Sequence, residues 1–139
     1  MILIDTSVWI ALIDSQDSCH SRAKDIVKDI FHEDVGIFDH IYGEILTVLR
    51  NKTSNEKCLK FVEYLKYTKI NINFCSKESF FMAQEFFFRF RKISFIDSLL
   101  MAFAKEINSD LITFDKELKK AWNQVKGKTY KPLPAEDSN

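Results

Sequence analysis

Short apolar runs alternate along the chain with longer segments in which apolar residues recur every three to four positions. The runs at 2–4, 35–38, 70–74 and 110–114 are apolar or β-branched, which is typical of short strands. The helical periodicity predicts helices at 6–13, 20–32, 40–52, 54–68, 77–91, 94–108 and 115–124. Ser54 or Asn55 is the expected N-cap of the helix at 54–68. Residues 129–131 are a candidate for one more edge strand.

Strands that alternate with helices predict an α/β fold in which a parallel sheet carries helices on both faces. We therefore expect a three-layer α/β/α arrangement around a short parallel sheet of four to five strands. The chain of 139 residues is long enough for one domain with a substantial core. No repeat or linker divides it.

Composition excludes several classes of protein. With 46% hydrophobic and 29% charged residues, the chain is expected to be globular rather than disordered. The three cysteines have no C-x-x-C spacing, so we expect reduced thiols in a cytoplasmic protein. The start lacks a basic signal-peptide region, and no apolar run is long enough to span a membrane. Neither a dinucleotide-binding glycine motif nor a P-loop is present.

Two acids directly follow predicted strands. Asp5 comes after the run at 2–4, and Asp115 comes after the strand at 110–114. In a parallel α/β sheet the binding site lies off the carboxyl ends of the strands, so both acids are expected at the functional edge. Each could instead serve only as the N-cap of the helix that follows it.

Two further acids lie on apolar faces of predicted helices. Counting three, four and seven residues on from Asp97 reaches only apolar positions, and Glu44 shares a side with Ile41 and Val48. Asp97 has a structural alternative as part of a capping box with Ser94, or as the partner of a buried arginine. Glu44 has alternatives as the partner of Arg50 or at a solvated helix edge. The other acids, among them Asp25, Asp29, Glu63, Glu106 and Glu117, fall on polar faces and are expected at the surface.

Four carboxylates brought into one pocket would repel one another strongly. A hard divalent cation resolves this repulsion, and a set of oxygen ligands selects Mg²⁺ or Mn²⁺ rather than zinc. A cation held in this way suits phosphate chemistry, because it activates water and stabilises charge on the leaving oxygen. The acids therefore raise the hypothesis of a metal-dependent enzyme that acts on phosphate esters.

Four motifs in order then resemble the PIN-domain family, and they cover roughly residues 1–134, with 135–139 as a C-terminal tail. They are "ILIDTSVWIALI", the glutamate in "YGEILTVLRNK", "SFIDSLLMAFAKE" and "DLITFDKEL". In size and layout the chain is similar to the VapC toxins of type II toxin–antitoxin pairs. That resemblance implies a ribonuclease dependent on Mg²⁺ or Mn²⁺, with an RNA substrate and an antitoxin partner.

The resemblance also implies roles for individual residues. The acidic quartet corresponds to Asp5, Glu44, Asp97 and Asp115, with metal held chiefly by Asp5 and Asp97. Glu44 and Asp115 would complete the coordination or orient the attacking water. Thr113 matches the hydroxyl residue of the family's last motif, and Thr6 or Ser7 matches the hydroxyl position after the first acid. Glu117 is left outside this set, and Leu118 stands where an aromatic residue is common.

Basic and aromatic segments suggest further contacts. The stretches 89–92 and 116–122 are the densest in positive charge and are candidates for contact with RNA phosphates, or for a solvated face. Besides its main apolar face, the helix at 77–91 carries a second stripe of Phe81 and Phe88. We expect this stripe to dock a second copy or an antitoxin; burial within the same chain is the alternative.

Other functions are weighed against the nuclease. A phosphatase of the haloacid dehalogenase type needs a second aspartate at the position of Ser7, and a receiver domain needs an early acidic pair and a late lysine. A PIN-like protein that only binds RNA or protein is a rival from another class, although all four acids are intact. An RNA-processing PIN nuclease outside a toxin–antitoxin pair also remains open.

Overall fold

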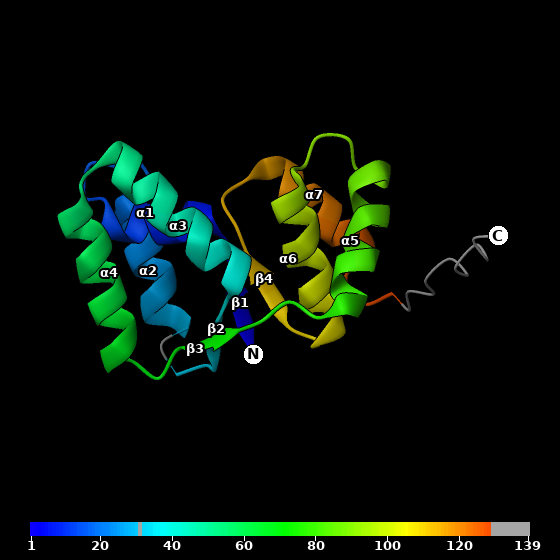
Figure 1. The fold of residues 1–139 in the computed structure, drawn as a ribbon, viewed down its shortest axis with the longest axis horizontal. Coiled ribbons are helices and arrows are strands. Elements are labelled where there is room, and N and C mark those ends of the chain that lie inside the picture. The colour runs from blue at the N-terminus through cyan, green and yellow to red at the C-terminus, as the bar shows by residue number, and fades with distance from the viewer. Residues whose placement is uncertain (31, 129–139) are drawn as a thin grey trace.

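The protein, a computed structural model, is described over residues 1–30 and 32–128. Across those residues seven helices surround a four-stranded sheet (Figure 1). The elements are, in chain order, β1 (Ile2–Ile4), α1 (Thr6–Ile13), α2 (His20–Ile30), β2 (Val35–Phe38), α3 (Asp39–Lys52), α4 (Asn55–Tyr67), β3 (Asn71–Asn73), α5 (Lys77–Arg89), α6 (Phe95–Glu106), β4 (Asp110–Ile112) and α7 (Lys116–Val125).

The predicted helices and strands within the described residues are confirmed, with small differences at their ends. Ser54 is the N-cap of α4, and its side chain accepts a hydrogen bond from the backbone N–H of Lys57. The candidate strand at 129–131 and the expected domain end at residue 134 lie outside the described residues. No described helix combines the length and the apolar character that crossing a membrane requires.

The sheet is parallel throughout, as expected, with strand order β3-β2-β1-β4. Its centre is apolar and covered on both faces, because Leu3 of β1 and Ile37 of β2 are fully buried. The chain steps from β1 to β2 to β3 in one direction and then returns across the sheet to β4. Right-handed crossovers place the helices of these two directions on opposite faces.

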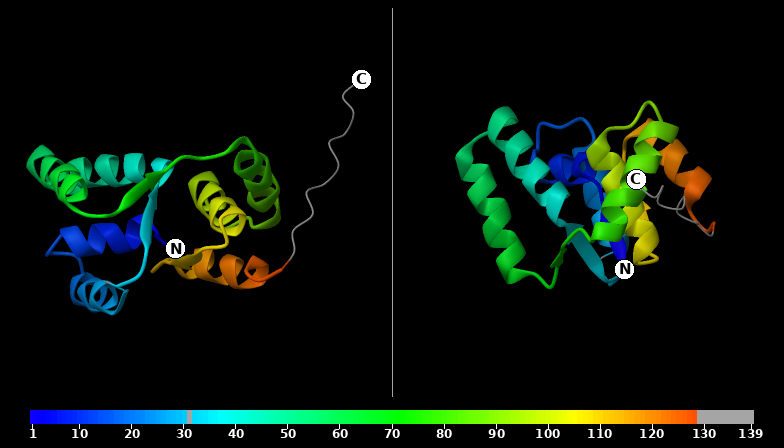
Figure 2. Two further views of the ribbon diagram at one scale, coloured as in Figure 1. Left: turned by 90° about the horizontal axis from the view of Figure 1, so that it is seen from below. Right: turned by 45° about the vertical axis from the view of Figure 1, so that its right-hand side comes forward.

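That rule accounts for the three layers. Helices α1–α4 lie on one side of the sheet and α5–α7 on the other (Figures 1 and 2). Helix α6 is buried along most of its length, from Ser98 to Ala104, because it packs beneath α5 and beside α3. The three-layer α/β/α expectation is therefore confirmed.

Helix α5 has an inner and an outer face. Ala83 and Phe86 are buried, and their side of the helix packs on α6. The outer stripe is open to solvent, with Phe81 at 53% and Phe88 at 78% exposure. Glu106 of α6 is exposed, as expected, yet its Oε2 also accepts from the hydroxyls of two serines at the start of α5, Ser76 and Ser79.

Candidate active site

The candidate site lies where the direction of the chain connections reverses. Strands β1 and β4 are neighbours, but the connection from β1 leads toward β2 while the connection into β4 arrives from β3. Crevices at such switch points, outside the carboxyl ends of the strands, are the usual binding sites of open α/β sheets. Asp5 follows β1, and Thr113, Phe114 and Asp115 follow β4, so the sheet brings both segments to this crevice.

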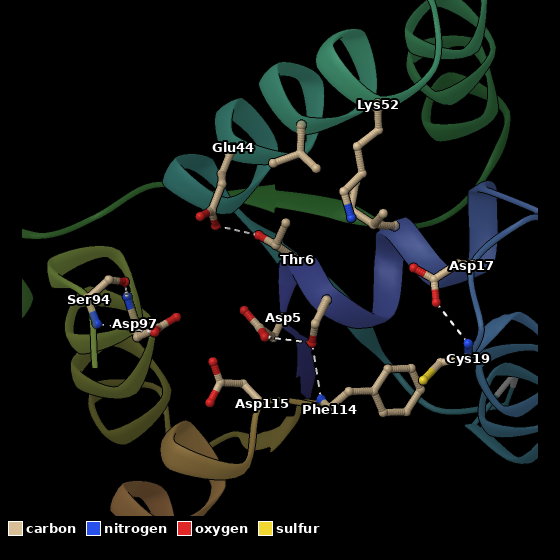
Figure 3. Close-up of a pocket in the computed structure, with 13 residues that line it drawn as sticks. Asp5, Thr6, Asp17, Cys19, Glu44, Lys52, Ser94, Asp97, Phe114 and Asp115 are labelled. Atoms are coloured by element: carbon tan, nitrogen blue, oxygen red, sulfur yellow. Dashed lines mark hydrogen bonds between the residues drawn. The ribbon is translucent and has the colours of Figure 1, made fainter. Parts of the chain in front are cut away.

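Asp5 is buried, with 4% of its surface exposed. It occupies the N-cap position of α1 without making a side-chain capping hydrogen bond, so the capping alternative does not explain this acid. Its Oδ2 instead accepts from Ser7 Oγ at 2.8 Å and from Thr113 Oγ1 at 2.7 Å. Two hydroxyls thus fix one carboxylate oxygen, and the other points toward Asp97 and Asp115 (Figure 3).

The same hydroxyls tie the loop after β4 to the start of α1. Ser7 Oγ accepts from the backbone N–H of Phe114 at 3.1 Å, and Thr113 Oγ1 accepts from the backbone N–H of Asp115 at 3.0 Å. Thr113, predicted as a site residue, therefore connects Asp5 with the segment that carries Asp115. Side chains held in this way keep the two acids in a fixed relation, which a catalytic or metal site requires.

Glu44 projects from α3 toward the start of α1. Its Oε2 accepts from Thr6 Oγ1 at 2.5 Å (Figure 3). Among the described residues, no salt bridge joins Glu44 to Arg50, so that alternative is wrong. The hydroxyl position after the first acid, left open between Thr6 and Ser7, is thus filled by both residues, each serving a different carboxylate.

Asp97 belongs to a capping box, as one structural alternative proposed, and among the described residues no salt bridge joins it to an arginine. It closes a capping box at the start of α6, where Ser94 Oγ accepts from its backbone N–H at 3.0 Å and its Oδ2 accepts from the Ser94 N–H at 3.3 Å. Its carboxylate also lines the crevice. Burial, and next the negative charge of Asp5, raise the pKa of Asp97 from 3.8 to about 6, against the hydrogen bonds from Ser94 that lower it.

Asp115 caps α7, as the structural alternative proposed. Its Oδ1 accepts from the backbone N–H groups of Glu117 at 2.9 Å and Leu118 at 3.0 Å. The cap does not remove it from the site, since the carboxylates of Asp5, Asp97 and Asp115 point toward one another from three separate elements (Figure 3). The charge of Asp115 also contributes to the raised pKa of Asp97.

A cavity of about 380 Å³ contains all four predicted acids. Its lining includes a fifth acid, Asp17, and one cationic side chain, Lys52. Neither was singled out in the sequence. The sequence did contain a reason to expect Lys52 near the site, because it lies four residues after Val48 and eight after Glu44 on the same face of α3. Asp17 comes from the loop between α1 and α2, where no periodicity indicates direction.

The residues of this cavity fit a hard divalent cation in their chemistry. In the described part of the chain, no group of three or more His, Cys, Asp or Glu side chains is arranged as a formed metal site. The donors that converge are nevertheless carboxylate oxygens, the ligands that Mg²⁺ and Mn²⁺ prefer. The raised pKa of Asp97 shows that its charge is poorly compensated within the protein.

Comparisons with known proteins agree with this fold. The chain is similar to the crystal structure of Mycobacterium tuberculosis VapC20, described as a sarcin-ricin loop cleaving toxin, with 22% identity and a TM-score of 0.75 over 87% of this chain and 95% of that chain. It is similar to FitAcB from Neisseria gonorrhoeae, with 18% identity and a TM-score of 0.65 over 88% of this chain and 94% of that chain. No curated protein matches. The model of the PIN domain matches residues 2–122, so the chain belongs to the PIN-domain family.

Proposed function

We propose that this protein is a metal-dependent ribonuclease that hydrolyses RNA phosphodiester bonds. The observation that carries the proposal is the convergence of Asp5, Asp97, Asp115 and Glu44 on one cavity at the switch point of the sheet. Two of these acids follow strands β1 and β4 and the other two lie on helices α3 and α6, and these four segments have no shared structural reason to place acids together. Membership of the PIN-domain family supports the same function.

In this proposal Asp5 and Asp97 are the principal ligands of Mg²⁺ or Mn²⁺, and Glu44 and Asp115 complete the coordination or orient the attacking water. The ion supplies activation of water and stabilisation of charge on the leaving oxygen when it is bound. The hydroxyls of Ser7 and Thr113 keep Asp5 in place through hydrogen bonds to Oδ2. Thr6 does the same for Glu44.

Lys52 is the cation best placed to meet the substrate at the cavity itself. It stands at the end of α3, on the wall opposite Asp97 and Asp115 (Figure 3). An RNA phosphate entering a cavity with five carboxylates gains from a positive charge on its far side. Among residues 89–92, none lines this cavity, and their contact with phosphate stays a prediction.

The proposal extends to a toxin of a toxin–antitoxin pair that acts in the cytoplasm. The similarity to VapC20 supports this extension, because that protein is described as a sarcin-ricin loop cleaving toxin. We place self-association on the outer stripe of α5, where Phe81 and Phe88 are exposed. Exposed aromatic patches of this kind commonly mark protein interfaces. A gene for a small antitoxin immediately upstream would support the pairing.

The alternatives are an RNA-processing nuclease without an antitoxin and a PIN-like module that binds RNA or protein without cutting it. The absence of a neighbouring antitoxin gene would favour the first. The second would have no need of a buried Asp5 whose carboxylate is held by two hydroxyls. An arrangement of this kind is typical of a site in which the position of charge matters.

Cleavage of a labelled structured RNA in the presence of Mg²⁺, Mn²⁺ or EDTA tests the proposal. Asp97→Asn, prepared identically, exposes contaminating nuclease, and Asp25→Asn changes an exposed acid of α2 outside the cavity as a matched control. We expect cutting that needs the metal, is lost in Asp97→Asn and persists in Asp25→Asn. Equal cutting by all three proteins would point to contamination or a different site. No cutting, with no rise of Tm on adding metal, would favour the binding module.

A further inference from the structure

A second, smaller hollow adjoins the carboxylate cavity. It measures about 230 Å³ and lies between α2 and the segment that runs from β4 into α7. Its charged lining residues are both cations, Arg22 from α2 and Lys119 from α7. The carboxylate cavity holds five acids and one lysine, so the two hollows are opposite in charge although they are neighbours.

Phe114 forms part of the wall of both hollows. Its ring extends away from the carboxylates, toward Cys19 just before α2 (Figure 3). The backbone N–H of Phe114 donates to Ser7 Oγ, the hydroxyl that also holds Asp5. The backbone that carries the ring is therefore held close to Asp5, at the boundary between the two hollows.

Arg22 is held above that ring. The guanidinium carbon lies 4.7 Å from the centroid of Phe114, in a cation–π contact. A guanidinium presents its N–H donors in a planar fork, which is the geometry that binds phosphate oxygens. Lys119 adds a second positive charge on the facing helix. The side chain of Arg22 remains exposed and accessible to a ligand.

We propose that Arg22, which rests on the ring of Phe114, and Lys119 bind a backbone phosphate of the RNA next to the one that is cut. This inference rests on the proposed ribonuclease function and adds to it the path of the substrate. The carboxylate cavity repels a polyanion, so affinity has to come from cations beside it. A phosphate contact does not depend on the identity of the base, so this contact serves single-stranded RNA segments in general.

Binding is measured by fluorescence anisotropy with a labelled single-stranded RNA of twelve nucleotides, over a series of salt concentrations. All proteins carry Asp97→Asn, so that the RNA is not cut during the titration. Arg22→Ala and Lys119→Ala are each expected to weaken binding about tenfold. The two substitutions together are expected to reduce the slope of log K against log salt by about 0.7, the value for one phosphate contact on a single strand, and each substitution alone by part of that amount.

Two lysines outside the hollow provide matched controls. Replacing either one removes a single positive charge from the helix that also carries the tested residue. Lys24 of α2 is exposed, and Lys120 of α7 pairs with Glu117 at 3.8 Å. Their alanine variants are expected to change affinity less than twofold. Arg22→Lys keeps the positive charge and loses the planar guanidinium. This variant is therefore expected to bind RNA more weakly than the protein with Arg22, with an unchanged dependence of log K on log salt. If Arg22→Ala fails to fold, Arg22→Lys still tests the contribution of Arg22 to RNA binding.

Cleavage kinetics on the background with Asp97 intact give a second readout. Arg22→Ala is expected to raise KM with little change in kcat, because the contact lies outside the reacting group. RNA binding that is equally weakened by Lys24→Ala and Lys120→Ala would overturn the inference while leaving the ribonuclease intact. So would a fall in kcat at unchanged KM. A protein that neither binds nor cuts RNA would overturn both proposals.

Discussion

Replacing Asp97 with asparagine is expected to stabilise the protein near neutral pH when divalent ions are absent. The substitution removes one negative charge from the cavity and keeps an oxygen that can accept from the Ser94 N–H. Burial and the charge of Asp5 raise the pKa of Asp97 to about 6, so the folded state holds this carboxylate charged at a cost. Asparagine does not incur that cost.

The shift in the pKa of Asp97 sets the size of the expected stabilisation. A rise from 3.8 to about 6 corresponds to about 3 kcal/mol, at roughly 1.36 kcal/mol per pKa unit. Because the side chain is only partly buried, solvent screening reduces this to about 1–2 kcal/mol. For a chain of this length, about 1 kcal/mol moves Tm by about 3 °C. We therefore expect Asp97→Asn to raise Tm by roughly 3–6 °C.

The stability that Asp97→Asn gains over the wild type depends on pH, and the sign of this dependence follows from the pKa shift. Below 3.8 Asp97 is protonated in the folded and unfolded states, and the substitution changes little. Between 3.8 and about 6 the unfolded chain loses the proton first, so the wild type loses stability relative to the variant as pH rises. Above about pH 6 the difference is complete.

Thermal melts in EDTA at several pH values between 4.5 and 7.5 measure the difference. Glu56→Gln is the matched control, because it neutralises an acid in the first turn of α4 whose side chain is 79% exposed. Its effect is expected to stay within about 0.5 kcal/mol at every pH. An Asp97→Asn variant no more stable than the wild type at pH 7.5, or stabilised equally at every pH, would refute the reasoning. Added Mg²⁺ should then stabilise the wild type more than the variant.

Three further substitutions test other parts of the structure. Thr113→Val removes the hydroxyl that bridges the two strand-end acids, and RNA cleavage should fall about 10–100-fold, whereas Thr47→Val on the exposed face of α3 should remain active. Lys105→Ala removes hydrogen bonds of 2.7 Å to the carbonyl of Val125, the last residue of α7, and of 2.6 Å to the carbonyl of Lys128. Urea unfolding should show a loss of about 2 kcal/mol, and a loss near zero would contradict the contribution of these bonds. Phe88→Lys should shift the protein toward monomer in sedimentation velocity, while Tyr67→Lys, at a 90% exposed aromatic on α4, should not.

Much of the fold was predictable because the information is local. Short apolar runs and helical periodicity were enough to find the helices and strands. Once the strand order is known, the handedness of the crossovers decides which face of the sheet each set of helices covers. The placement of Asp5 and Asp115 at the ends of strands was also visible in the sequence. The same local rules gave the capping box of Asp97.

What could not be predicted depends on packing between distant segments. Thr6 and Ser7 are adjacent on α1 and therefore point in different directions, and only the docking of α3 and β4 decides that one serves Glu44 and the other Asp5. The contact of Arg22 with Phe114 joins α2 to the loop after β4. No pattern within either segment indicates its partner.

The cavity also shows how the fold accommodates a concentration of like charge. Asp5, Asp97 and Asp115 each stand at the N-terminal end of a helix, where the helix dipole favours a negative charge by about 0.3–1 kcal/mol. These contributions do not fully offset the repulsion and burial, since the pKa of Asp97 remains raised. An RNA phosphate would add further negative charge to a cavity lined by five acids and one lysine. A divalent cation held by Asp5 and Asp97 would offset this repulsion, and cations beside the cavity would favour the approach of the substrate.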